Sequence, residues 1–196
     1  VVHLREDRRH IKERDVYILR QVVKSKLNLE MSIAADILDI ACDVKPDQAT
    51  LVPEKRQELT TEGGLDVIHL ADPIGSVVER MHEAGILVSL FVDPQDGQIS
   101  ASLGAGADMV EIHTGAYSDA PTERRRKDEL KKVVQSVKRA REMGLGVNAG
   151  HGLHYHNVRD VAVIPGIDEL SIGHSILARA LFTGLDRAIR DMIALM

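Results

Sequence analysis

The sequence has one cysteine, Cys42, and no tryptophan, and aromatic residues make up 3% of its 196 residues. A single cysteine excludes an internal disulfide and is typical of a reducing compartment, so we expect a cytoplasmic protein. With so few aromatic residues the core has to be aliphatic. The stacking platforms that bind single-stranded nucleic acid are therefore not expected.

An excess of positive charge and long apolar runs are also lacking. The net charge of -5 argues against a general nucleic-acid-binding protein. No apolar run approaches the roughly 20 residues of a membrane span, so no contact with a membrane is expected. We see no signal-peptide pattern, although the chain begins at Val1 inside a strand-like run.

What the sequence does contain is a repeated alternation of strand and helix patterns. Helical spacing with one apolar face occurs over 33–41 and 130–140, and a last helix is expected over 176–195. Four glycines stand where helices end, as C-caps do: Gly85, Gly104, Gly106 and Gly144. The strand-like runs begin at Val1, Leu27, Ala49, Ile86, Asp108, Leu145 and Glu169.

This alternation predicts parallel strands with right-handed crossovers. Seven units of about 28 residues favour an α/β fold of the TIM (β/α)8 barrel type, with one domain over 1–196. A doubly wound open sheet is the competitor, but the first strand lacks the glycine-rich loop typical of it. Because a barrel closes with eight strands, we expect the first β/α unit to be missing upstream. The long connection 54–72 is expected to act as a lid.

The segment 2–10 concentrates charge at the end of a strand. Alternation places His3 and Arg5 on one face, and two more arginines and His10 follow before a helix expected near Ile11. Cations beside a helix N-terminus suit an anion such as phosphate. A solvated charge cluster that caps the helix is the alternative.

Polar residues recur at the carboxyl ends of the other strands, where barrels carry their functional groups. Such residues are costly for folding unless they serve a site. In chain order, the strand ends carry His3, Arg5, Glu30, Glu54, Lys55, Asp93, Glu111, His113, Thr114, His151, Gly173 and His174.

Two carboxylates among these residues suit acid–base chemistry. Glu30 shares a face with Asn28, and a carboxylate directed into a dry barrel has a raised pKa and can act as a general base. Glu111 shares a face with His113, and either side chain can orient the other or meet a substrate. A structural ion pair with a neighbouring arginine or lysine is the alternative for Glu30, and a purely structural role is the alternative for Glu111.

Glycines surround the next candidate, His151, in the run NAGHGLHYHN. They let the backbone approach a ligand closely, and a histidine there can pass protons. The nearby His154 and His156 resemble a metal tract, but their spacing matches no fixed helical or strand geometry, so metal binding is not favoured.

A second anion site is expected where the last helix begins. Gly173 and His174 follow a strand directly, and together with Gly152 they match the phosphate site that barrels form after strands seven and eight. A simple helix cap is the alternative. Lys55 could form a Schiff base, but its charged neighbours favour a solvated or ion-paired lysine. Two anion sites flanking acid–base groups indicate an enzyme that joins two phosphorylated small molecules.

Several motifs carry a family resemblance from Val1 to the C-terminus: VHLREDRRHI, NLEM, LVPEKRQELTTEGGLDV, EIHTGAY, NAGHGLHYHNV and SIGHSI. They closely resemble the pyridoxine 5'-phosphate synthase family of bacterial vitamin B6 biosynthesis. The resemblance implies a barrel that condenses 1-deoxy-D-xylulose 5-phosphate with 3-amino-2-oxopropyl phosphate. The products would be pyridoxine 5'-phosphate, phosphate and water, with no metal or organic cofactor. It also implies a homo-octamer.

The resemblance further implies a role for each matching position. His3 and Glu30 would be general bases, His151 the general acid, and Glu111 the carboxylate that stabilises the transition state. The family's binders of deoxyxylulose phosphate match Arg5, His10 and Thr60. Those that hold the phosphate of the amine substrate match Gly152, Gly173 and His174.

The departure from the family lies at the start, where an asparagine, an aspartate–histidine pair and an arginine of the family's first strand and loop have no counterpart. We therefore expect this chain alone to show little synthase activity. Two other functions stay open. One is a metal-dependent aldolase or lyase with a four-residue ligand set: Glu30, Glu111, His113 and His151. The other is a non-catalytic phosphate-binding or assembly subunit.

Overall fold

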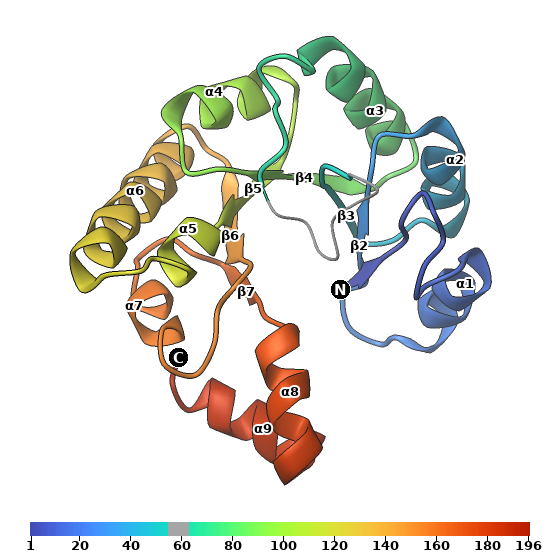
Figure 1. The fold of residues 1–196 in the computed structure, drawn as a ribbon. Helices are drawn as coiled ribbons and strands as arrows, with labels where there is room; N and C mark the ends of the chain where they lie inside the picture. Colours follow the sequence, from blue (N-terminus) through green and yellow to red (C-terminus); the bar gives the residue numbers. More distant parts are fainter. Residues whose placement is uncertain (55–62) are drawn as a thin grey trace.

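The computed structural model describes residues 1–54 and 63–196. Strands and helices alternate along the chain (Figure 1). In order they are β1 (Val2–His3), α1 (Glu13–Val22), β2 (Asn28–Met31), α2 (Ala35–Val44), β3 (Gln48–Leu51), α3 (Ala71–Glu83), β4 (Leu87–Val92), α4 (Asp96–Gly104), β5 (Met109–His113), α5 (Gly115–Ser118), α6 (Glu123–Glu142), β6 (Gly146–Gly150), α7 (Val158–Ala162), β7 (Glu169–Ser171), α8 (His174–Thr183) and α9 (Leu185–Ile193).

The strands form one parallel sheet in the order β1 to β7, so each strand pairs with its neighbours in sequence. The sheet curls, and the helices lie around its outside (Figure 1). This arrangement confirms the predicted barrel class and all seven predicted strands. In the described sheet β1 and β7 are the edges. None of the described helices is long and apolar enough to cross a bilayer.

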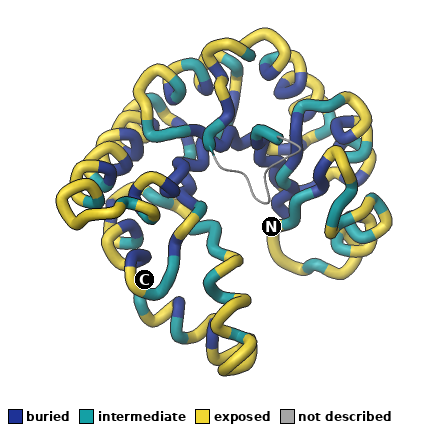
Figure 2. Tube along the Cα trace, viewed as in Figure 1, coloured by how far each residue is buried: buried dark blue, intermediate teal, exposed yellow. Residues whose placement is uncertain are grey.

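The hydrophobic core lies between the sheet and the helices. Apolar side chains alternate along each strand and join helix residues such as Ile37, Ile74 and Val133 in one cluster. Burying each such side chain contributes about 1.5–3 kcal/mol. Figure 2 shows buried residues concentrated on the strands and on the helix sides that face them. The strand residues of this outer face include Leu29, Met31, Ala49, Leu51, Val88, Leu90, Val110, Ile112, Val147 and Ala149.

The opposite, inner face of the sheet is polar although it is buried. Register partners share a face in a parallel sheet, and Asn28 pairs with Gln48, as Glu30 does with Thr50. The hydroxyl of Thr50 donates to Asn28 Oδ1 at 3.0 Å and accepts from Gln48 Nε2 at 3.3 Å. The core outside the sheet thus leaves the inner face free for polar groups. The buried polar residues of this face include Asn28, Gln48, Thr50, Ser89, Glu111 and Asn148.

Some predicted helix boundaries were wrong. The expected helix over 176–195 is two helices, α8 and α9, because Gly184 between them has φ of +80° and ψ of 154°. Gly104 belongs to the last turn of α4. The other three predicted C-caps, Gly85, Gly106 and Gly144, do take positive φ directly after helices.

The connection after β3 is anchored on both sides of the segment that lies outside the described residues. Before that segment, Glu54 contacts His3. After it, the Leu65 amide donates to the Phe91 carbonyl at the end of β4, at 2.7 Å. Lys55 and Thr60 lie outside the described residues, so the roles expected of them stay predictions, as does the lid.

Candidate active site

His3 stands between two carboxylates at the carboxyl end of the sheet. Its Nε2 lies 3.0 Å from Glu54 Oε1, and its Nδ1 lies 3.7 Å from Glu30 Oε2. The pairing of β1 with β2 places His3 and Glu30 in register, and the chain after β3 brings in Glu54. A histidine with a carboxylate on each side can take up and release a proton.

The two carboxylates have pKa values shifted in opposite directions. Burial raises the pKa of Glu30, and the charge of His3 opposes this only in part. Burial also acts to raise the pKa of Glu54, but hydrogen bonds from His3 and from the Glu6 amide outweigh it and lower that pKa. Glu30 is therefore the better proton acceptor of the two near neutral pH.

Glu111 is buried on the inner face of β5. Burial, together with the charge of Glu30, raises its pKa to about 8. Its Oε2 has no hydrogen-bond partner among the described residues. On the neighbouring β6, a Cβ at Gly150 would collide with Glu111 Oε1. The glycine makes room for the carboxyl group, which is mostly protonated at pH 7 and can donate a hydrogen bond.

His151 follows β6 with a backbone φ of +78°, a region that non-glycine residues seldom adopt. The hydroxyl of Thr114 donates to the carbonyls of Gly150 and His151, at 2.7 and 2.6 Å. The ring of His151 lies edge-on to that of His113, with centroids 5.0 Å apart. Strained residues of this kind persist where the surroundings hold them and are common at functional sites.

Two arginines beside the first expected anion site form ion pairs with nearby carboxylates. Arg8 donates to Glu13 and to Asp36, both at 2.7 Å, and Arg9 pairs with Asp7 at 2.6 Å. Arg8 and Arg9 thus bind nearby carboxylates, which is the arrangement of the alternative, a charge cluster beside α1.

Arg5 and His10 remain as candidates for this site. Arg5 is buried, with Nε 3.6 Å from Asp7 Oδ1. His10 is exposed in the loop after β1, and its φ is +67°.

The second expected anion site has its elements side by side. Gly173 is the N-cap of α8, and His174 is the first residue of that helix. The hydroxyl of Ser175 donates to the Leu153 carbonyl at 2.9 Å, which ties the start of α8 to the loop that holds Gly152. Gly173 is exposed and has open space where a side chain would be. Free amides at a helix N-terminus suit a phosphate group.

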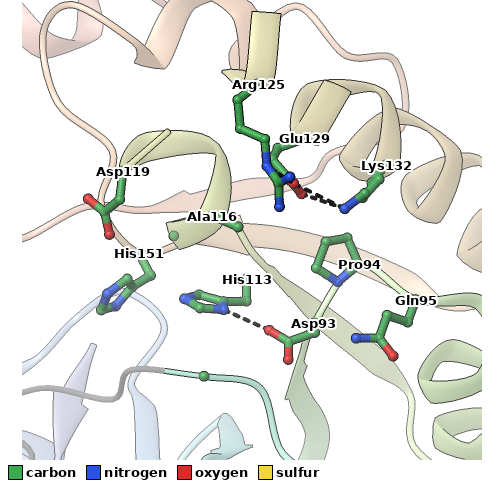
Figure 3. A pocket seen from close by; sticks show the side chains of 12 residues that line it. Asp93, Pro94, Gln95, His113, Ala116, Asp119, Arg125, Glu129, Lys132 and His151 are labelled. Atoms are coloured by element: carbon green, nitrogen blue, oxygen red, sulfur yellow. Dashed lines mark hydrogen bonds and ion pairs between the residues drawn. The ribbon is translucent and has the colours of Figure 1, made fainter. Parts of the chain in front are cut away.

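A pocket of about 710 Å³ opens beside His113 and His151 (Figure 3). Our sequence reasoning did not assign its side chains from α6 to a site. There Glu129 is buried between Arg125 and Lys132, each 2.9 Å away. The sequence did contain a signal for this cluster, because Glu129 is four residues after Arg125 and three before Lys132, spacings that pair on a helix. The lining is Gly63, Asp93, Pro94, Gln95, His113, Gly115, Ala116, Asp119, Arg125, Glu129, Lys132 and His151.

The candidate residues do not come together as metal ligands. In the part of the chain that the structure describes, no group of three or more histidine, cysteine or acidic side chains has a geometry that could hold a metal ion. The ligand set expected for an aldolase, with Glu30 and His151 among its members, is thus not assembled.

Comparison with solved structures supports the barrel-like fold. Thiamine phosphate pyrophosphorylase from Pyrococcus furiosus superposes with a TM-score of 0.62 at 17% identity, covering 98% of this chain and 80% of that one. KGPDC from Streptococcus mutans gives a TM-score of 0.61 at 18% identity, covering 93% of this chain and 78% of that one. At this identity the likeness concerns the fold alone.

Comparison of sequences is more specific. The family described as "Pyridoxal phosphate biosynthesis protein PdxJ" matches residues 1–196. Pyridoxine 5'-phosphate synthase of Geobacter metallireducens is 57% identical over 194 residues, which cover 99% of this chain and 81% of that protein. The synthase of Syntrophobacter fumaroxidans is 53% identical over 195 residues, covering 100% of this chain and 82% of that protein. With a family match along its whole length and more than half of its residues shared with these synthases, this chain belongs to the pyridoxine 5'-phosphate synthase family of vitamin B6 biosynthesis.

Proposed function

We propose that the protein condenses 1-deoxy-D-xylulose 5-phosphate with 3-amino-2-oxopropyl phosphate to give pyridoxine 5'-phosphate, phosphate and water. The observation that carries this proposal is the cluster of His3 with Glu30 and Glu54, together with the buried Glu111, whose pKa burial and the charge of Glu30 raise to about 8. Ring closure with loss of water and phosphate needs protons to be added to and removed from carbon and oxygen. Groups of differing pKa around one cavity can supply them.

Each acid–base residue has a role in this proposal. Glu30, with its raised pKa, and His3 remove protons as general bases, and His151 donates a proton to a leaving oxygen. Glu111 stabilises charge that develops in the transition state. The amine of the substrate itself forms the imine, so a lysine nucleophile is not required.

The two phosphate groups are held on opposite sides of these residues. Arg5 and His10, with Thr60, bind deoxyxylulose phosphate, and the α8 N-terminus with Gly152, Gly173 and His174 binds the phosphate of the amine substrate. The tie between Ser175 and Leu153 supports the second assignment. Holding both substrates by their phosphates brings the reacting carbons together, which by itself lowers the barrier.

We further propose a single cytoplasmic barrel domain that assembles as a homo-octamer. Large exposed apolar side chains on α8 and α9, among them Leu181 and Phe182, support an assembled state.

The test is the Glu30→Gln variant of the full-length protein, assayed for formation of pyridoxine 5'-phosphate from both substrates. The change keeps the size of the side chain and removes its basicity, so kcat should fall by about 10²- to 10⁴-fold with an unchanged circular dichroism spectrum. Glu142→Gln at the exposed end of α6 is the control and should keep normal activity. Near-normal turnover by Glu30→Gln would exclude Glu30 as the base.

A further inference from the structure

Among the residues that the structure describes, His113 makes one hydrogen bond although it is almost entirely buried. Its side chain is the last of β5, and the residue is 7% exposed. Its Nδ1 lies 2.8 Å from Asp93 Oδ1, directly after β4 (Figure 3). Its Nε2 is buried without a hydrogen-bond partner among the described residues. Neither Asp93 nor His113 has a part in the function proposed above.

Asp93 is held in its ionised form. The hydrogen bond from His113 lowers the pKa of Asp93 most, burial opposes it, and the charge of His113 and the Gly64 amide at 3.2 Å lower that pKa further. An ionised carboxylate can only accept hydrogen bonds, so Nδ1 of His113 carries the proton. This contact therefore sets both the tautomer and the ring orientation of His113.

The oriented ring of His113 packs against His151. The two rings meet edge to face at 68°, with centroids 5.0 Å apart, and Phe91 lies 5.1 Å from His113 and 6.5 Å from His151. Gly115 lies against both imidazole rings and leaves no room for a side chain. A Cβ there would collide with His113 Nε2 and lie 3.2 Å from His151 Cδ2. The imidazole of His151 thus rests on a ring whose own position depends on Asp93.

We propose that Asp93 and His113 are positioning residues, which hold the imidazole of His151 in the orientation needed for proton transfer. The inference rests on the proposed function, in which His151 is the general acid. Asp93 acts on His113 through a hydrogen bond, and His113 acts on His151 through ring packing. Neither of them exchanges a proton with the substrate.

The kinetic test uses four variants of the full-length protein: Asp93→Asn, His113→Ala, His151→Ala and the double variant His113→Ala/His151→Ala. Misplacing a catalytic group by about 1 Å can cost on the order of 100-fold. We therefore expect kcat of the first two variants to fall about 10- to 100-fold, with KM within about twofold of the original. The double variant should be no slower than His151→Ala, because His113 acts through His151. If the fold-decrease of kcat in the double variant equals the product of the two single decreases, the proposal is overturned.

A control variant tests whether losing any histidine–carboxylate pair lowers kcat, or only the pair that packs against His151. His82 Nε2 lies 2.9 Å from Asp108 Oδ2, next to the amino end of β5. His82→Ala removes a comparable contact far along the strand from His151 and should leave kcat unchanged. If His113→Ala does not fold, the test relies on Asp93→Asn. That change keeps the volume of the Asp93 side chain and leaves the ring of His113 in the protein. A matching loss of activity in His82→Ala would count against positioning.

A spectroscopic measurement tests the inference without turnover. Imidazole nitrogen NMR should show His113 protonated at Nδ1, and Asp93→Asn should move the ring signals of both His113 and His151. A second outcome separates this inference from the proposed function. If these signals move but the original protein forms no pyridoxine 5'-phosphate, or His151→Ala turns over normally, the proposed function fails and the positioning stands. Unchanged His151 signals in Asp93→Asn would refute the positioning itself.

Discussion

Glu111 illustrates how one buried residue links stability to chemistry. Its pKa of about 8 means that folding keeps a proton on a carboxyl group whose ordinary pKa is 4.5. Burial favours the neutral form because a lone charge is poorly solvated inside the barrel. The same neutral form can donate a hydrogen bond to developing negative charge. The site therefore retains a group that lowers stability near neutral pH.

This coupling predicts how stability changes with pH. Between pH 4.5 and 8 the unfolded chain releases the Glu111 proton and the folded protein keeps it, so this residue lowers the free energy of unfolding as pH rises. The slope is up to about 1.4 kcal/mol per pH unit. Glu111→Gln removes that slope. In urea unfolding, the stability of the variant relative to the original should therefore rise steadily from pH 5.5 to 8.

Asp47 provides a control, because its pKa is shifted in the opposite direction from that of Glu111. The Leu27 amide and Arg20 lower its pKa, so it is ionised in both states throughout this range. Asp47→Asn should therefore cost a constant amount of stability from pH 5.5 to 8. A pH-independent difference for Glu111→Gln would show that Glu111 is ionised in the folded protein.

At the scale of one element, β6 shows why its glycines are not equivalent. Gly146 and Gly150 lie on the same face of the strand. A Cβ at Gly146 would meet the flexible end of Met109, with Cγ at 2.8 Å. A Cβ at Gly150 would collide with Glu111 and lie 2.9 Å from Ser171 Cβ on β7. Only the first contact can be relieved by a side-chain rotation.

We accordingly predict different costs for two similar substitutions. Gly150→Ala should destabilise the protein by about 1–3 kcal/mol, as overpacking does. Gly146→Ala should be close to neutral, because reduced freedom of the unfolded chain offsets the small shift of Met109. Equilibrium unfolding in urea measures both. Equal costs would mean that Glu111 can move aside as easily as Met109.

At the scale of the whole molecule, the last two helices differ from the rest. No residue of α8 is buried, and α8 and α9 extend from the curled sheet (Figures 1 and 2). Leu181 is 85% exposed and Phe182 is 89% exposed. The hydroxyl of Tyr155, in the loop between β6 and α7, donates to the Ala188 carbonyl at 2.8 Å and holds α9 to that loop. Exposed apolar patches of this kind mark interaction surfaces.

The assembly can be tested by placing charge on this surface. The double variant Leu181→Glu/Phe182→Glu should lower the molar mass measured by light scattering, because burying two carboxylates at an apolar interface is costly. Val163→Glu, at an exposed apolar position after α7, is the control and should leave the mass unchanged. An unchanged mass in the double variant would place the interface elsewhere.

The sequence by itself determined the order of strands and helices, the barrel class and the strand ends that carry Glu30, Glu111 and His151. Those features depend on local hydrophobic periodicity and on the rule that parallel strands end at one rim, both of which can be read along the chain. The sequence did not predict the boundary between α8 and α9. The apolar spacing continues across Gly184 and so gives no sign of the turn there.

The tertiary structure alone decided which charged groups pair and which stay available for chemistry. Glu54 meets His3 across 51 residues of sequence, and Asp93 meets His113 across 20. Arg8, in the loop after β1, donates to Asp36 of α2 across 28 residues. Hydrogen bonds and desolvation depend on distances of a few ångströms between remote segments, and the spacing of residues along a chain does not contain those distances.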